Sequence, residues 1–220
     1  MFNFKTKNGQ KLLAAGNWLW SLFTINLTWF LLNFTFILTS IIWAQLPISG
    51  IFYRLLLVLA AMLIIFVIPS LIAVFATVNQ WRLDGNGTFF KVMLQNWLAA
   101  LQQVKVTLPL GLVAASLLVL NKLVYGQPLP HMFVLTTAFI YCSLLIAVSY
   151  TAGQQTNIFL PLILAHPGRL VVVTAIFIGL IVINFILQLA FLLVICSVAL
   201  AAVITDKFWG QPACKLSGQH

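Results

Sequence analysis

The chain has almost no acidic residues. Its 220 residues include no glutamate and two aspartates, Asp84 and Asp206, whereas 63% are hydrophobic and 6% are charged. A soluble protein needs charged side chains of both signs across its surface, so this composition excludes an ordinary soluble domain. Most of the chain consists of apolar runs, several of them longer than the ~18 residues typical of a membrane-spanning helix. The sequence therefore predicts an all-α fold, a polytopic bundle of transmembrane helices forming a single domain over residues 1–220.

The residue patterns that catalysis and metal binding require are also missing. The three cysteines form no CxxC pair, and the three histidines form no HxxxH or HExxH pattern. Neither a GxSxG elbow nor a GxxxxGK[ST] phosphate loop occurs. We therefore expect no enzyme activity and no catalytic, cofactor-binding or metal-binding residues. A proton- or sodium-coupled pump is disfavoured too, because such pumps use membrane-embedded carboxylates and both aspartates fall outside the predicted spans.

The apolar runs predict five spans, or six if the last run folds into two. They are predicted over residues 18–44, 52–79, 106–124, 132–152 and 170–205. Pro69 lies inside the second span and should kink it by removing one backbone hydrogen bond. The last run would measure ~54 Å as one helix, well over the ~30 Å hydrocarbon core. No glycine or proline marks a tight turn near Asn184 and Gln188, so the sequence favours one long tilted helix over a hairpin.

One segment between the spans is too polar to cross a membrane. Phe90, Met93 and Trp97 recur three to four residues apart within residues 88–104, which predicts an amphipathic helix lying in the cytoplasmic interface.

The basic residues predict the orientation of the chain. If the N-terminus is cytoplasmic, two basic residues, Arg54 and Lys122, face outward. The cytoplasmic side then holds Lys5, Lys7, Lys11, Arg82, Lys91, Lys105 and Arg169. Lys and Arg accumulate in cytoplasmic loops, so we expect a multi-pass protein of the cytoplasmic membrane with its N-terminus inside. The formal charge of +9 reflects this topology, and we expect no nucleic-acid partner.

Two spans carry polar residues that could line a ligand path. Asn26, Asn33 and Ser40 recur every seven residues on the first span, and Thr137 and Tyr141 belong to the hydroxyl-rich fourth span. One interpretation is a polar lining for an uncharged solute. The commoner role of such residues is hydrogen bonding between helices, and we favour that role.

A second candidate site lies around the predicted interfacial helix. Arg82, Asp84, Lys91 and Trp97 combine charge with an aromatic ring beside this helix, which suggests a docking point for a cytoplasmic partner. The alternative is a basic and aromatic anchor at the membrane interface.

The helix end from Ile68 to Trp81 is followed by a Gly-rich turn and by a Phe-rich segment from Phe89 to Trp97. With this arrangement the chain resembles, over most of its length, the YesL family of bacterial integral membrane proteins (domain of unknown function 624). The segment from Asn17 to Asn33 is similar to the first span of the family. The resemblance implies an accessory membrane subunit linked to carbohydrate uptake, and it supplies no functional residues.

These observations lead to one expected function and one alternative. We expect a non-enzymatic accessory or scaffold protein of the bacterial cytoplasmic membrane, with the lipid bilayer and transporter permease subunits as partners. The alternative is a small autonomous transporter or channel for an uncharged solute, lined by Asn26, Asn33, Thr137 and Tyr141. Self-association into a homo-oligomer and the side of the C-terminus stay open.

Overall fold

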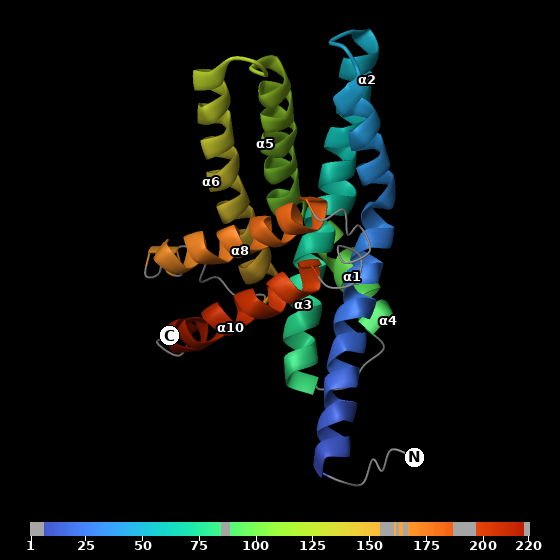
Figure 1. Ribbon diagram of the computed structural model, residues 1–220, viewed down its shortest axis with the longest axis vertical. Coiled ribbons are helices and arrows are strands. Elements are labelled where there is room, and N and C mark those ends of the chain that lie inside the picture. The colour runs from blue at the N-terminus through green and yellow to red at the C-terminus, as the bar shows by residue number, and fades with distance from the viewer. Residues whose placement is uncertain are drawn as a thin grey trace.

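All regular elements in the described part of the chain are helices, which confirms the predicted all-α fold (Figure 1). The structure is a computed structural model that describes residues 7–84, 89–154, 161, 163–164, 167–186 and 197–217. Its elements are α1 (Lys7–Gln45), α2 (Gly50–Met62), the π-helical turn η1 (Leu63–Val67), α3 (Ile68–Asp84), α4 (Phe89–Leu101), α5 (Val104–Leu123), α6 (Pro128–Gly153), α8 (Pro167–Ile186) and α10 (Val198–Ser217).

Four helical stretches among the described residues are long and apolar enough to cross a membrane. They are Ala15–Gln45, Gly50–Arg82, Val104–Leu123 and Pro128–Gly153, and they correspond to the first four predicted spans. Their outward faces expose large apolar side chains, including Leu31, Leu57, Leu112 and Phe133. Apolar surface on this scale suits contact with lipid rather than water. The chain is thus compatible with a multi-pass membrane protein.

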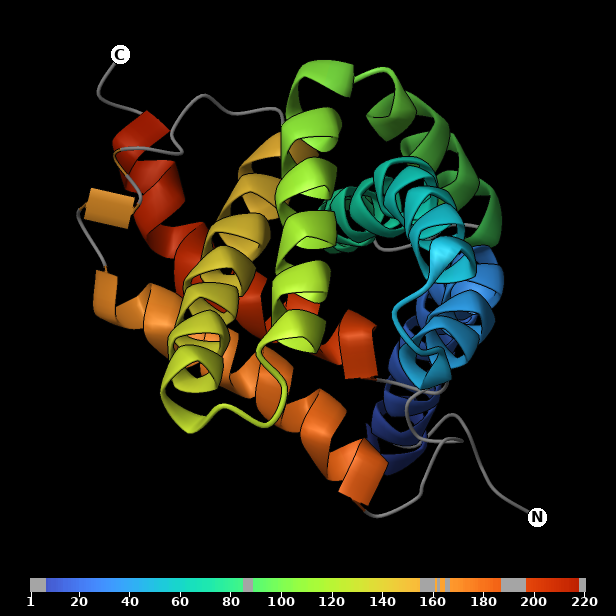
Figure 2. The ribbon, with the colours of Figure 1, turned by 90° about the horizontal axis from the view of Figure 1, so that it is seen from above.

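The predicted final span, 170–205, is two helices rather than one. Helix α8 ends at Ile186 and α10 begins at Val198. The two helices run antiparallel, side by side, across the long axis of the molecule (Figures 1 and 2). The absence of Gly and Pro near Asn184 misled the prediction, because those residues favour tight turns but are not required for a helix to end.

The second predicted span contains a local irregularity at Pro69. Proline has no backbone N–H, so the carbonyl of Ile65, four residues earlier, loses its usual helical donor. The π-helical turn η1 immediately precedes α3 at this point. The indole N–H of Trp97 supplies a replacement donor to the Ile65 oxygen at 3.2 Å. The predicted disturbance at Pro69 is therefore present, and a neighbouring helix compensates for it.

Helix α3 is the centre of the bundle, with α1, α4, α5, α6 and α10 packed around it. Its residues from Ile68 to Phe75 are all buried. Helix α4, expected over 88–104, contacts α3 and α1 through the buried side chains of Met93 and Ala100. Packing between helices in lipid depends on close van der Waals contact and on hydrogen bonds. Here α4 is a packed member of the bundle.

Lys122 connects the ends of two of the long helices. Its ammonium group, at the last turn of α5, donates to the backbone oxygen of Ala44 at the last turn of α1, at 2.7 Å. A cation is favourable at a helix C-terminus, where carbonyl groups have no helical donor. Lys122 therefore has a structural role in addition to its contribution to the predicted orientation.

Candidate functional site at the junction of α3, α6 and α10

A buried carboxylate joins three helices near the end of α3. Asp206 of α10 is 7% exposed. Its Oδ2 lies 3.0 Å from Nη1 of Arg82, on α3. Its Oδ1 accepts a hydrogen bond of 3.3 Å from the side-chain amide of Gln154, the residue that follows α6. The carboxylate has a partner on each oxygen, as a buried charge requires.

Two opposing effects act on the pKa of the Asp206 carboxyl. Burial raises the pKa of the Asp206 carboxyl above its ordinary value, and the Arg82 guanidinium partly opposes that rise. Half of the Arg82 side chain is exposed (51%), so water screens the ion pair. Desolvation is therefore the larger effect on this carboxyl.

Two aromatic side chains form the apolar wall beside this carboxylate. Tyr150 of α6 and Trp209 of α10 are each 1% exposed, and their rings meet edge to face at 5.1 Å between centroids. The ring of Phe75, on α3, lies edge to face against the other side of Tyr150. The Tyr150 hydroxyl makes no hydrogen bond with the described residues. The junction therefore combines a charged pair with a tightly packed aromatic cluster.

The two asparagines of the predicted polar stripe on α1 are buried and bond to other helices, whereas Ser40 is half-buried and donates to the Ile37 oxygen of its own helix. Asn26 Oδ1 accepts hydrogen bonds from the backbone N–H groups of Val198 and Ala199, at 3.0 and 3.2 Å. These N–H groups open α10, so Asn26 caps that helix from outside, as an N-cap residue does from within. Asn33 Nδ2 donates to Ser70 Oγ on α3 at 2.8 Å. The two asparagines thus serve two different helix contacts.

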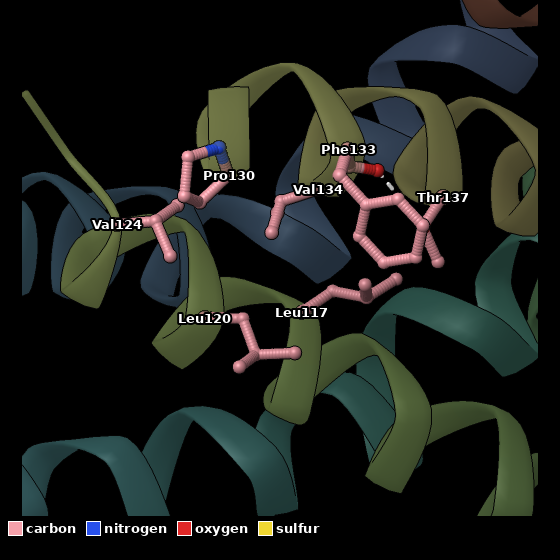
Figure 3. Close-up of a pocket in the computed structure, with 7 residues that line it drawn as sticks. All are labelled: Leu117, Leu120, Val124, Pro130, Phe133, Val134 and Thr137. Carbon is pink, nitrogen blue, oxygen red and sulfur yellow. Dashed lines mark hydrogen bonds between the residues drawn. The ribbon is translucent and has the colours of Figure 1, made fainter. Parts of the chain in front are cut away.

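The two hydroxyl groups of α6 that were predicted to line a ligand path bond to backbone oxygens. Thr137 donates to the oxygen of Phe133 in its own helix, and Tyr141 donates to the oxygen of Leu110 in α5 at 2.8 Å. A pocket of about 310 Å³ lies between α5 and α6 (Figure 3). Its lining consists of Leu117, Leu120, Val124, Pro130, Phe133, Val134 and Thr137. The pocket is apolar, because the one hydroxyl in its lining donates to its own helix.

Among the described residues of the predicted docking point, Arg82 and Trp97 have different partners. Arg82 contacts Asp206, and the indole of Trp97 bonds to Ile65 and stacks on Phe66. Lys91 is exposed on α4. The side chain of Asp84 lies outside the described residues. Trp97 therefore holds α4 to the bundle.

Asp206 was not among the predicted site residues. It lies just beyond the predicted final span and entered only the argument against a proton- or sodium-coupled pump. The scarcity of acidic residues was the signal that could have found it, because a chain with two carboxylates has few ways to balance a buried cation. Its partners Arg82 and Gln154 lie 124 and 52 positions away, and no spacing rule connects them.

The described helices define an all-α bundle with four stretches suited to crossing a membrane and an ion-pair junction at one end of α3. No protein-family model matches the chain, and no match was found among curated proteins or solved structures.

Proposed function

We propose that the chain is a non-enzymatic accessory or scaffold protein of the bacterial cytoplasmic membrane that binds permease subunits of a carbohydrate transporter. The bacterial setting and the link to sugar uptake follow from the resemblance to the YesL family. The orientation, with the N-terminus and α4 on the cytoplasmic side, follows from the distribution of basic residues.

The proposal rests on helix α4, which packs one face against the bundle and exposes another. One face is fixed to the bundle through Met93, which is fully buried, and through the Trp97 indole. The other side exposes Leu98 (55%) and the ammonium group of Lys91, and Phe90 (50%), which shares the face of Met93 and Trp97, lies at its edge. Apolar side chains bordered by polar groups are typical of an interaction surface. A helix held by one face can present the other to a partner without unfolding.

The hydrogen bonds inside the bundle favour a scaffold over a solute path. Asn26, Asn33 and Tyr141 each bond to a neighbouring helix. Such bonds hold helices together in lipid. A solute path would need these groups to converge on one polar cavity, and they serve separate helix pairs instead.

Co-purification with a charge-reversed α4 tests the proposal. We would tag the full chain, purify it from host cells in mild detergent and quantify co-purifying permease subunits by mass spectrometry. Lys91→Glu combined with Leu98→Ala should reduce their recovery at least about tenfold, the effect of ~1.4 kcal/mol of lost binding energy. Arg82 is left intact, because its reversal would also break the ion pair with Asp206.

Arg54→Glu is the matched control. Arg54 is exposed near the start of α2, at the far end of the molecule from α10 (Figure 1), and its reversal should leave recovery unchanged. Equal recovery from the wild type and the α4 variant would refute docking through α4. A protein that purifies alone and conducts an uncharged solute after reconstitution would support the transporter instead.

A further inference from the structure

Three basic residues contact or belong to one turn of α10. Arg82 reaches this turn from α3 and pairs with Asp206 at 3.0 Å. Arg169 reaches it from α8 and donates to the backbone oxygen of Phe208 at 3.1 Å. Lys207 lies between these two contact points in the sequence, and its side chain is exposed. Both arginines are exposed as well, and each guanidinium has five N–H donors, so donors remain for an external ligand.

The charge of this basic cluster (Arg82, Arg169 and Lys207) is not balanced locally. The three cations face one carboxylate, that of Asp206, which leaves 3 − 1 = +2. The sequence contains one further acidic residue, Asp84, at the end of α3. Adding it still leaves 3 − 2 = +1. An anion near this turn is therefore attracted by the cluster.

Exposed apolar residues are neighbours of the basic cluster in the sequence. Val171 and Val172 directly follow Arg169 on α8 and are 51% and 46% exposed, and Phe208 is 42% exposed. Arg82 also lies in the last turn of α3, which continues the apolar helical stretch that begins at Gly50. A ligand that fits this surface has an anionic group next to hydrocarbon, which is the chemistry of a membrane lipid. A soluble phosphate would use the cations and leave the apolar border uncovered.

We propose that the basic cluster binds the phosphate headgroup of an anionic membrane lipid, whose acyl chains cover the exposed valines of α8. Basic pockets at the cytoplasmic ends of membrane helices commonly recognise such headgroups. The bound lipid would join α3, α8 and α10 at the junction where Asp206 is buried. The site does not depend on the proposed partner, because Lys91 and Leu98 of α4 are not part of it.

Lipid titration of the purified full chain tests this site. We would add short-chain phosphatidylglycerol, or phosphatidylcholine with the same chains, to the protein in non-ionic detergent and count bound lipid by native mass spectrometry. Phosphatidylglycerol should bind at least about fivefold more tightly, and Lys207→Gln should remove about fivefold of that affinity, the effect expected of one basic residue. Arg54→Gln, at the other end of the molecule, should change nothing.

Several outcomes would overturn the proposal. Equal binding of the two lipids would do so, as would an unchanged phosphatidylglycerol affinity in Lys207→Gln or an equal loss in Arg54→Gln. Displacement of the lipid by millimolar inorganic phosphate would assign the cluster to a soluble anion. A co-purifying protein released by Lys207→Gln, with lipid binding unaffected, would assign it to a protein partner. Lys207 makes no hydrogen bond or ion pair within the described part of the chain, so its replacement should leave the fold intact.

Discussion

The indole N–H of Trp97 donates to the backbone oxygen of Ile65, and the two atoms are 3.2 Å apart. Pro69 stands four residues after Ile65 and offers that oxygen no N–H. A side chain on α4 therefore satisfies a carbonyl group that the proline leaves without a helical donor. Arg169 and Phe208 show the same relationship, because Pro212 stands four residues after Phe208 and the Arg169 guanidinium donates to the Phe208 oxygen.

A double-mutant cycle tests the link between Trp97 and Pro69. Trp97→Phe keeps an aromatic ring against Phe66 and removes the N–H, so it should lower the free energy of unfolding by about 1–3 kcal/mol. In a Pro69→Ala background the new backbone N–H can serve Ile65, and the cost of Trp97→Phe should shrink by about 1 kcal/mol. Denaturant unfolding in detergent micelles measures the cost of Trp97→Phe in both backgrounds. The same cost in both backgrounds would show that the indole N–H does not compensate for the proline.

The N-terminus of α10 should depend on Asn26. Asn26→Leu keeps the approximate side-chain volume but leaves the N–H groups of Val198 and Ala199 without the Asn26 acceptor. We expect a loss of about 2 kcal/mol or more in the free energy of unfolding. Ser116→Ala is the control, because Ser116 is exposed and donates only to its own helix, and its effect should stay within about 0.5 kcal/mol. Similar effects of the two substitutions would argue against the cap.

Close packing of α6 on α3 should depend on Gly153. A Cβ atom added there would lie 2.9 Å from the Ala76 nitrogen and 3.1 Å from the Ile72 oxygen. Backbone atoms cannot move aside as a side-chain end can, so Gly153→Ala should cost about 1–3 kcal/mol. Gly179→Ala on α8 meets open space and should be neutral or slightly stabilising. Thermal unfolding of the two variants compares them, and an unaffected Gly153→Ala protein would contradict the close approach.

The ionisation of Asp206 should make stability depend on pH. Because burial raises its pKa in the folded protein, the folded state holds this proton at pH values where the unfolded chain has released it. The contribution of Asp206 is thus most favourable below the unfolded value of about 3.9, and it declines as the pH rises through the folded pKa.

Asp206→Asn removes this dependence while keeping a hydrogen-bonding side chain. The thermal stability of the wild type relative to the variant should therefore fall as the pH rises above about 4, and the fall reports the raised pKa. A relative gain over the same range would mean that the ion pair with Arg82 outweighs the cost of burying the charge.

Local sequence patterns were enough to predict the helices and their approximate ends. The run from Val106 to Val124 corresponds to α5, and the run from Met132 to Ala152 corresponds to α6. The length of an apolar run predicts such helices, because a segment in lipid must make its backbone hydrogen bonds within itself. The irregularity at Pro69 was predictable for the same reason.

Contacts between distant residues were not predictable from these patterns. The seven-residue spacing of Asn26 and Asn33 favoured helix contacts, but it could not show that Asn26 caps α10, 172 positions away. Charge counts placed Arg82 at a loop, but they could not pair it with Asp206. Such pairings depend on which helices become neighbours, and one sequence contains no direct record of that.

Site-specific photo-crosslinking on α4 is the most direct test of the account. A photoreactive residue would replace Leu98, exposed on α4, and in a separate variant Leu57, 72% exposed on α2. In intact cells the account predicts a discrete crosslink from position 98 to a permease subunit and lipid adducts alone from position 57. Lipid adducts alone at both positions, or the same protein crosslink from both, would contradict a docking surface on α4.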